Sequence, residues 1–149
     1  MTSATIWRRV LLWAPPLAYM GFIFYLSSES DPLPGLTRVV WDKALHGGGY
    51  ALLGALLARA ATGEGRRSAA AWMFGAIAGS IYGASDEWHQ SFVAGRDADV
   101  LDWAADTVGS AVGATCLVVL VSLWHGQIVR RWPRLARLHG LVGTSARVR

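Results

Sequence analysis

The sequence is poor in charge and nearly without cysteine. Only 16% of its residues are charged, against about 25% in a typical soluble domain, and Cys116 is the single cysteine. One cysteine excludes an intramolecular disulfide and a cysteine-based zinc site. The HExxH zinc motif, the GxSxG nucleophile elbow and a glycine-rich phosphate loop set between a strand and a helix are also missing. Enzyme classes that depend on those motifs are therefore excluded.

What the sequence has instead is long apolar runs. Hydrophobic residues make up 53% of the chain, and a run of about 20 apolar residues is enough to cross a bilayer as a helix. We expect four such helices, at about residues 10–26, 41–61, 69–85 and 103–124. A cleaved signal peptide is the alternative for the first run, but no small-x-small site follows it. The predicted fold class is all-α, a polytopic membrane bundle of about four transmembrane helices.

Glycines recur at four-residue spacing in the last two runs: Gly75, Gly79 and Gly83 in one, Gly109 and Gly113 in the other. Glycines on one face let two helix backbones approach closely in a membrane. We therefore expect these faces to pack against neighbouring helices.

Basic residues predict the orientation. Eleven of the 14 flank the runs on one side: Arg8, Arg9, Arg59, Arg66, Arg67, Arg130, Arg131, Arg134, Arg137, Arg147 and Arg149. Under the positive-inside rule, that side of the plasma (inner) membrane is cytoplasmic and contains both termini. We expect a transmembrane domain over residues 1–125 and a basic tail over 126–149, in the cytoplasm or on the membrane surface. Because the basic residues form no single stripe, a nucleic-acid partner is not expected.

Three polar groups fall on the opposite, extracytoplasmic side. Asp42, His46 and Tyr50 are four apart and share a helix face. The stretches 85–92 and 95–106 supply further ionisable residues, and Asp106 is expected about one turn inside the membrane. A carboxylate at that depth is costly unless it is paired, hydrogen-bonded, protonated or metal-bound. Solvated charges that only end the helices are the alternative, which we favour for Glu29, Asp31, Asp97 and Asp99.

The candidate roles divide into three sets. The catalytic candidates are Asp86, Glu87, His89, Asp102 and Asp106. The substrate-binding candidates are Lys43, Tyr50, Gln90 and Arg96. The metal-binding candidates are Asp42, His46 and His89. We expect His46, Glu87, His89, Arg96 and Asp102 to form one connected cluster, with Arg96 paired to Glu87 or Asp102 if no metal is bound.

Two mechanisms remain open for such a cluster. Histidine and carboxylates suit a divalent metal that polarises a phosphoryl group or activates water. Alternatively, Glu87 or His89 is a general acid or base while Arg96 holds an anionic head group. The expected partners are membrane lipids and an anionic lipid-linked substrate, and no oligomeric state is predicted.

These residues carry a family resemblance over about residues 10–124. The first signature of the VanZ-like membrane proteins resembles Asp42-Lys43-x-x-His46-x-x-x-Tyr50-x-x-Leu53-Gly54. The second is similar to Ser85-Asp86-Glu87-x-His89-Gln90-x-Phe92-x-x-Gly95-Arg96, and the third to Asp102-x-x-x-Asp106-x-x-Gly109, where many members carry asparagine in place of Asp106.

The resemblance implies a bacterial cell-envelope protein, since the founding member of the family is associated with teicoplanin resistance. It implies no established reaction. Binding or modification of an anionic lipid-linked or peptidoglycan-related component is our leading hypothesis. A non-catalytic transport or lipid-handling protein, or a membrane assembly partner that uses the glycine faces, are the alternatives.

Overall fold

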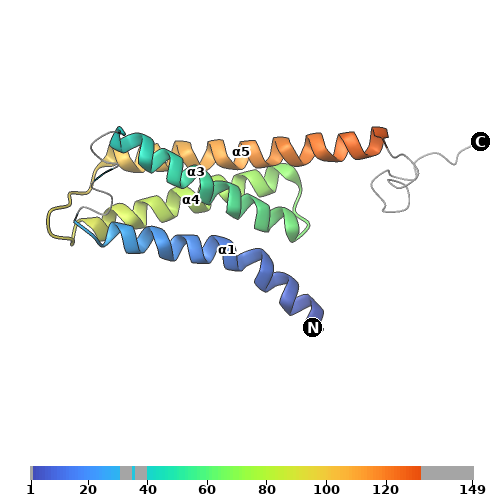
Figure 1. Ribbon diagram of the computed structural model, residues 1–149, viewed down its shortest axis with the longest axis horizontal. Coiled ribbons are helices and arrows are strands. Elements are labelled where there is room, and N and C mark those ends of the chain that lie inside the picture. The colour runs from blue at the N-terminus through green and yellow to red at the C-terminus, as the bar shows by residue number, and fades with distance from the viewer. Residues whose placement is uncertain (1, 31–34, 36–39, 132–149) are drawn as a thin grey trace, which may run out of the picture.

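The described residues form an up-and-down arrangement of four long helices. A computed structural model describes residues 2–30, 35 and 40–131. Its helices are α1 (Ser3–Ser27), α3 (Asp42–Gly63), α4 (Ser68–Gln90) and α5 (Val100–Arg131), which lie side by side in Figure 1. The predicted all-α class is confirmed. Successive helices alternate in direction, so α1 begins and α5 ends at the same end of the molecule.

Three helices extend clearly further than the sequence predicts, and α1 does so by beginning at Ser3 instead of about residue 10. α4 continues through residues 86–90, and the chain then turns between Ser91 and Gly95, whose φ is +80°. α5 runs to Arg131, past the expected start of the tail at residue 126. The rest of the predicted tail, residues 132–149, lies outside the described residues.

Glycines allow α3, α4 and α5 to pack closely. A Cβ on Gly113 would overlap the backbone of Ala51, and a Cβ on Gly109 would lie 2.9 Å from Cα of Gly47. On α4, a Cβ on Gly79 would overlap the side chain of Ser110. The prediction that the glycine faces pack against neighbouring helices is therefore confirmed.

α1 is attached to the other three helices less closely. It contains Pro15 and Pro16, and Figure 1 shows its N-terminal part bent away from the bundle, because a proline inside a helix removes a hydrogen bond and kinks the axis. The hydroxyl of Tyr19 donates to the carbonyl of Gly49 at 3.2 Å. The hydroxyl of Tyr82 on α4 donates to the carbonyl of Met20 at 2.6 Å. These bonds hold the C-terminal half of α1 against α3 and α4.

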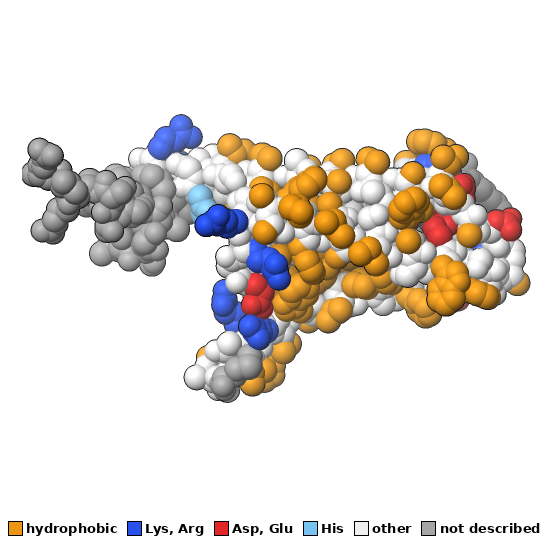
Figure 2. All heavy atoms as spheres, turned by 180° about the vertical axis from the view of Figure 1, so that it is seen from behind, with side chains coloured by type: hydrophobic (Ala, Val, Ile, Leu, Met, Phe, Trp, Pro, Cys, Tyr) orange, Lys and Arg blue, Asp and Glu red, His pale blue; other side chains and the backbone are white. Residues whose placement is uncertain are grey.

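The distribution of side chains is the reverse of that in a soluble protein. The buried set includes Asp86, Glu87, Asp102 and Asp106, whereas many large apolar side chains on all four helices are exposed. Figure 2 shows orange side chains over the flank of the molecule, with most basic side chains toward one end and acidic ones toward the other. A soluble protein seldom exposes so much contiguous apolar surface, so this surface indicates contact with lipid.

Two of the four predicted spans have the length and the apolar composition of a membrane-crossing helix. Residues Ser3–Ser27 and Val100–Gln127 are long and apolar enough to cross a membrane. α3 and α4, with 22 and 23 residues, reach about 33–35 Å, which matches a hydrocarbon core of about 30 Å. In the described part of the chain, the four-span prediction is thus supported for two helices.

Candidate functional site

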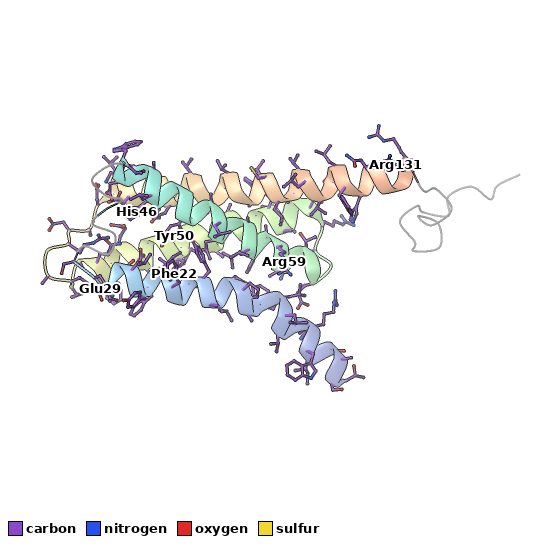
Figure 3. All side chains as sticks on the ribbon, viewed as in Figure 1. Phe22, Glu29, His46, Tyr50, Arg59 and Arg131 are labelled. Carbon is purple, nitrogen blue, oxygen red and sulfur yellow. The ribbon has the colours of Figure 1, made fainter. Side chains whose placement is uncertain are left out.

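The buried acidic residues gather where four helix ends meet. This end of the molecule contains the last turn of α1, the first turns of α3 and α5, and the last turn of α4. Figure 3 shows His46 and Glu29 there, with Arg59 and Arg131 toward the opposite end. The exposed fractions of the four buried acidic residues are 4%, 7%, 7% and 0% for Asp86, Glu87, Asp102 and Asp106. Carboxylates this deeply buried need specific partners.

His46 lies between two of these carboxylates. Its Nδ1 atom is 3.1 Å from Oδ1 of Asp106, and its Nε2 atom is 4.0 Å from Oδ1 of Asp102. Asp106 is fully buried, so its contact with His46 is one of the few it can make. The four-residue spacing of Asp102 and Asp106 puts both carboxylates on one face of α5, opposite α3.

Lys43 neutralises the outer part of the cluster. Its Nζ atom is 2.6 Å from Oδ1 of Asp102 and 2.5 Å from Oδ2 of Asp99. The bond from Lys43 is the main cause that lowers the pKa of Asp99, and the backbone N–H of Leu101 lowers it further. Asp99 therefore belongs to an ion pair, although the sequence favoured a solvated helix-end charge. That pair is lost only as pH falls through the lowered pKa.

Besides Oδ1 of Asp102, which lies 2.6 Å from Nζ of Lys43, three buried oxygens have no hydrogen-bond partner among the described residues. Oε2 of Glu87 accepts the backbone N–H of Asp99 at 2.7 Å, but Oε1 of Glu87 accepts nothing. Oδ2 of Asp106 and the hydroxyl of Tyr50 also have no hydrogen-bond partner among the described residues. A buried oxygen without a hydrogen bond costs about 1–3 kcal/mol, so these atoms mark a place for a ligand, an ion or a proton.

The geometry offers two possible metal sites, and both contain His46. Asp42, His46 and Asp102 form one, and His46, Glu87 and Asp106 form the other. In each, three ligand atoms lie within 4.8 Å of one another. The predicted metal ligands His46 and Asp42 therefore do come together, in the first group.

Arg96 does not make the ion pair that the sequence predicted. Its Nε and Nη2 atoms both donate to Oε1 of Gln90, at 3.0 and 2.6 Å. Gln90 in turn donates through Nε2 to Oδ2 of Asp86 at 3.2 Å. Within residues 2–30 and 40–131, no carboxylate of Glu87 or Asp102 pairs with Arg96. The long side chain of Gln90 intervenes, so Arg96 is bonded to a neutral amide.

His89 does not join His46. Its ring stacks on Phe24 of α1 with centroids 4.4 Å apart, and Nε2 is 3.1 Å from Oγ of Ser28. Two residues along a helix turn the side chain by about 200°, so His89 and Glu87 face different neighbours. The structure thus brings together His46, Glu87, Asp102 and Asp106, and it leaves His89 at the contact with α1.

A cavity of about 130 Å³ opens beside the cluster. Its polar wall includes side chains from α3, α4 and the following turn: Asp42, His46, Tyr50, Asp86, Gln90 and Arg96. Its other wall is formed by α1, through Tyr19, Phe22, Ile23 and Leu26. The motifs did not predict this second wall, although the spacing i, i+3, i+4, i+7 of its residues is typical of one helix face.

The fold and the site define a class: an all-helical membrane protein whose ionisable residues are buried at one end of the bundle. Within that class, the model of the VanZ/LLP1 family matches residues 4–122, and the chain belongs to this family. Neither the curated proteins nor the solved structures provide a significant match to the chain. The family that the three polar motifs suggested is thereby confirmed.

Proposed function

We propose that this protein binds an anionic, lipid-linked or peptidoglycan-related component of the bacterial cell envelope in the cavity between α1, α3 and α4. The observation that carries the proposal is the division of the cavity into an apolar wall on α1 and a polar wall that contains Arg96. An amphipathic molecule needs both kinds of wall. A cavity of about 130 Å³ is small beside ligand pockets of about 300–1,000 Å³, so it suits a head group.

Arg96 supports the anionic character of the ligand. Its two described bonds go to the amide oxygen of Gln90, and a guanidinium that lacks a carboxylate partner can hold a phosphate or carboxylate by paired hydrogen bonds. The apolar wall of α1 then continues along the lipid chains. Such a molecule would reach the cavity sideways from the membrane, past the loosely attached α1.

We place the protein in the plasma membrane with four spans, both termini in the cytoplasm and the polar site on the extracytoplasmic side. The positive-inside rule supports this orientation, and the separation of basic and acidic ends in Figure 2 agrees with it. A site on that side would face extracytoplasmic envelope components, which is consistent with the association of the family's founding member with teicoplanin resistance.

The second candidate is that the protein modifies the molecule it binds. The observation that favours it is the position of His46, which lines the cavity and also contacts the buried carboxylates Asp102 and Asp106. Catalytic sites often contain an ionisable side chain that lines a cavity and also contacts buried carboxylates.

The experiment is lipid identification. The full-length protein is extracted gently from bacterial membranes, and the lipids that remain bound are identified by mass spectrometry. We expect one anionic component that Arg96→Gln loses and Arg59→Gln, at the far end of α3, retains. The same lipid profile in wild type and Arg96→Gln would contradict binding at this cavity. His46→Gln distinguishes binding alone from chemical modification. If the protein is a catalyst, this variant should accumulate the unmodified substrate relative to wild type. If the protein only binds the molecule, the same lipid should be found in the variant and in wild type.

A further inference from the structure

We infer that His46, Glu87 and Asp106 form a binding site for a divalent first-row metal ion, of the kind of Zn²⁺ or Mn²⁺. This inference goes beyond the proposed function, since it concerns the buried side of the cluster and not the molecule in the cavity. It stands on the separations of the donor atoms, on two unpartnered buried oxygens and on the charges around them.

The donor atoms have the right separations. One nitrogen and two carboxylate oxygens of these residues lie within 4.8 Å of one another. Two atoms that are each about 2.1 Å from one ion lie roughly 3–4 Å apart, and Nδ1 of His46 is already 3.1 Å from Oδ1 of Asp106. The residues come from α3, α4 and α5, so the close packing of those helices brings the three donors together.

Each carboxylate keeps one oxygen free. Glu87 is 7% exposed and Asp106 is fully buried. Oε2 of Glu87 is oriented by the backbone N–H of Asp99, whereas Oδ1 of Asp106 lies 3.1 Å from Nδ1 of His46, the other proposed ligand. The other oxygen of each has no partner among the described residues. A partner that orients a carboxylate while its second oxygen stays free is the usual surrounding of a metal ligand.

Gly83 leaves room beside the site. It precedes Glu87 by one turn on the same face of α4, and a Cβ there would lie only 3.0 Å from Oδ2 of Asp106. Any side chain at that position would push against the oxygen that has no partner. The glycine thus lets Asp106 sit fully inside the helix interface.

The charges favour a cation at this site over the outer group. Oδ1 of Asp102 already lies 2.6 Å from Nζ of Lys43, and Asp42 is exposed, so the outer group of Asp42, His46 and Asp102 has a cation beside its one buried carboxylate. In the described part of the chain, neither Glu87 nor Asp106 has a lysine or arginine within 4.0 Å. Two buried carboxylates that face no lysine or arginine are best balanced by a divalent ion.

The test uses the full-length protein in detergent, stripped with a chelator and titrated with Zn²⁺ or Mn²⁺ alone. We expect one ion per chain, counted by elemental analysis, and an affinity reduced more than about 100-fold in Glu87→Gln and in Asp106→Asn, since even outer-shell partners are worth about 10- to 100-fold. The matched controls His89→Gln and Asp42→Asn remove a histidine or a carboxylate at the same end of the bundle, and they should retain the ion.

Folding is controlled separately. Circular dichroism of each stripped variant shows whether it is still helical, and the visible spectrum of Co²⁺ bound to wild type reports nitrogen and oxygen ligands without any substitution. Stripped wild type that binds neither ion would overturn the inference. So would binding that survives both carboxylate substitutions, or binding that is lost in Asp42→Asn, which would point to the outer group. Metal binding is measured on lipid-free protein, so its outcome is independent of the lipid experiment.

Discussion

Lys43 on α3 and Asp102 on α5 form an ion pair with 2.6 Å between Nζ and Oδ1. Their side chains are 18% and 10% exposed, so most of the water around both charges has been removed. The pair joins the first turns of the two helices that pack most closely.

We predict that Lys43→Met destabilises the protein more than Asp102→Asn. Loss of the lysine leaves Asp102 buried without a counter-charge, which costs about 3 kcal/mol for a broken buried pair. Loss of the carboxylate leaves Lys43 paired with Asp99. Thermal unfolding in detergent measures both variants. In the double variant, the stability should recover relative to Lys43→Met alone. Purely additive losses would show that the two charges do not interact.

We predict that Gly113→Ala destabilises the bundle while Gly48→Ala does not. A Cβ on Gly113 would overlap the backbone of Ala51, which no rotamer change can relieve, whereas a Cβ on Gly48 would meet nothing within 4 Å. Overpacking typically costs about 1–3 kcal/mol, and alanine is favoured over glycine by about 1 kcal/mol in an open helix position. The two melting temperatures should therefore move in opposite directions. A stable Gly113→Ala variant would mean that α3 and α5 are not in contact there.

Much of this arrangement could be predicted from the sequence. The four-residue spacing of Asp42, His46 and Tyr50 put them on one face, and all three line the cavity. The same spacing predicted the glycine contacts. Burying a charged side chain within an apolar helix costs free energy unless the charge is paired. The positions of such residues in the sequence therefore indicate where buried pairs form. Periodicity along one helix was sufficient for these features.

Contacts between helices were harder to predict. The positions of Arg96 and Gln90 in the sequence do not show which acceptor the long side chain of Arg96 reaches. In the structure it donates to the amide oxygen of Gln90 and to no carboxylate of Glu87 or Asp102. His89 carried a chemical signal but faces α1, because its direction depends on the rotation of α4 about its axis. The apolar face of α1 has no charged residue, so only its spacing could have revealed the cavity wall.

We predict that His89→Ala loosens α1 without affecting the buried cluster. The substitution removes a ring stack with Phe24 and a contact with Ser28, and such aromatic pairs contribute about 0.5–1.5 kcal/mol. Hydrogen exchange should therefore increase in the last turns of α1 and stay unchanged in residues 43–50 of α3. His89→Phe retains the stack and should behave nearly as wild type. Faster exchange in α3 would instead connect His89 to the cluster.

The last prediction concerns α4, which is long enough to cross the membrane but less apolar than α1 and α5. Ser68 begins this helix and Ala94 lies in the turn after its end, so about 35 Å of helix separates the two positions. If α4 crosses, the two positions lie on opposite sides of the bilayer. Single cysteines, Ser68→Cys and Ala94→Cys in a Cys116→Ser background, make this measurable with a maleimide that cannot pass through membranes.

We expect the maleimide to label Ala94→Cys in intact cells and Ser68→Cys only after the membranes are opened. The reason is electrostatic: Arg66 and Arg67 adjoin Ser68, and basic residues stay on the cytoplasmic side, whereas the carboxylates near Ala94 are free to face outward. Labelling of both cysteines from one side would mean that α4 does not cross the membrane. Exchange of the two sides would put His46 and its carboxylates at the cytoplasmic surface, where an extracytoplasmic envelope component could not reach them.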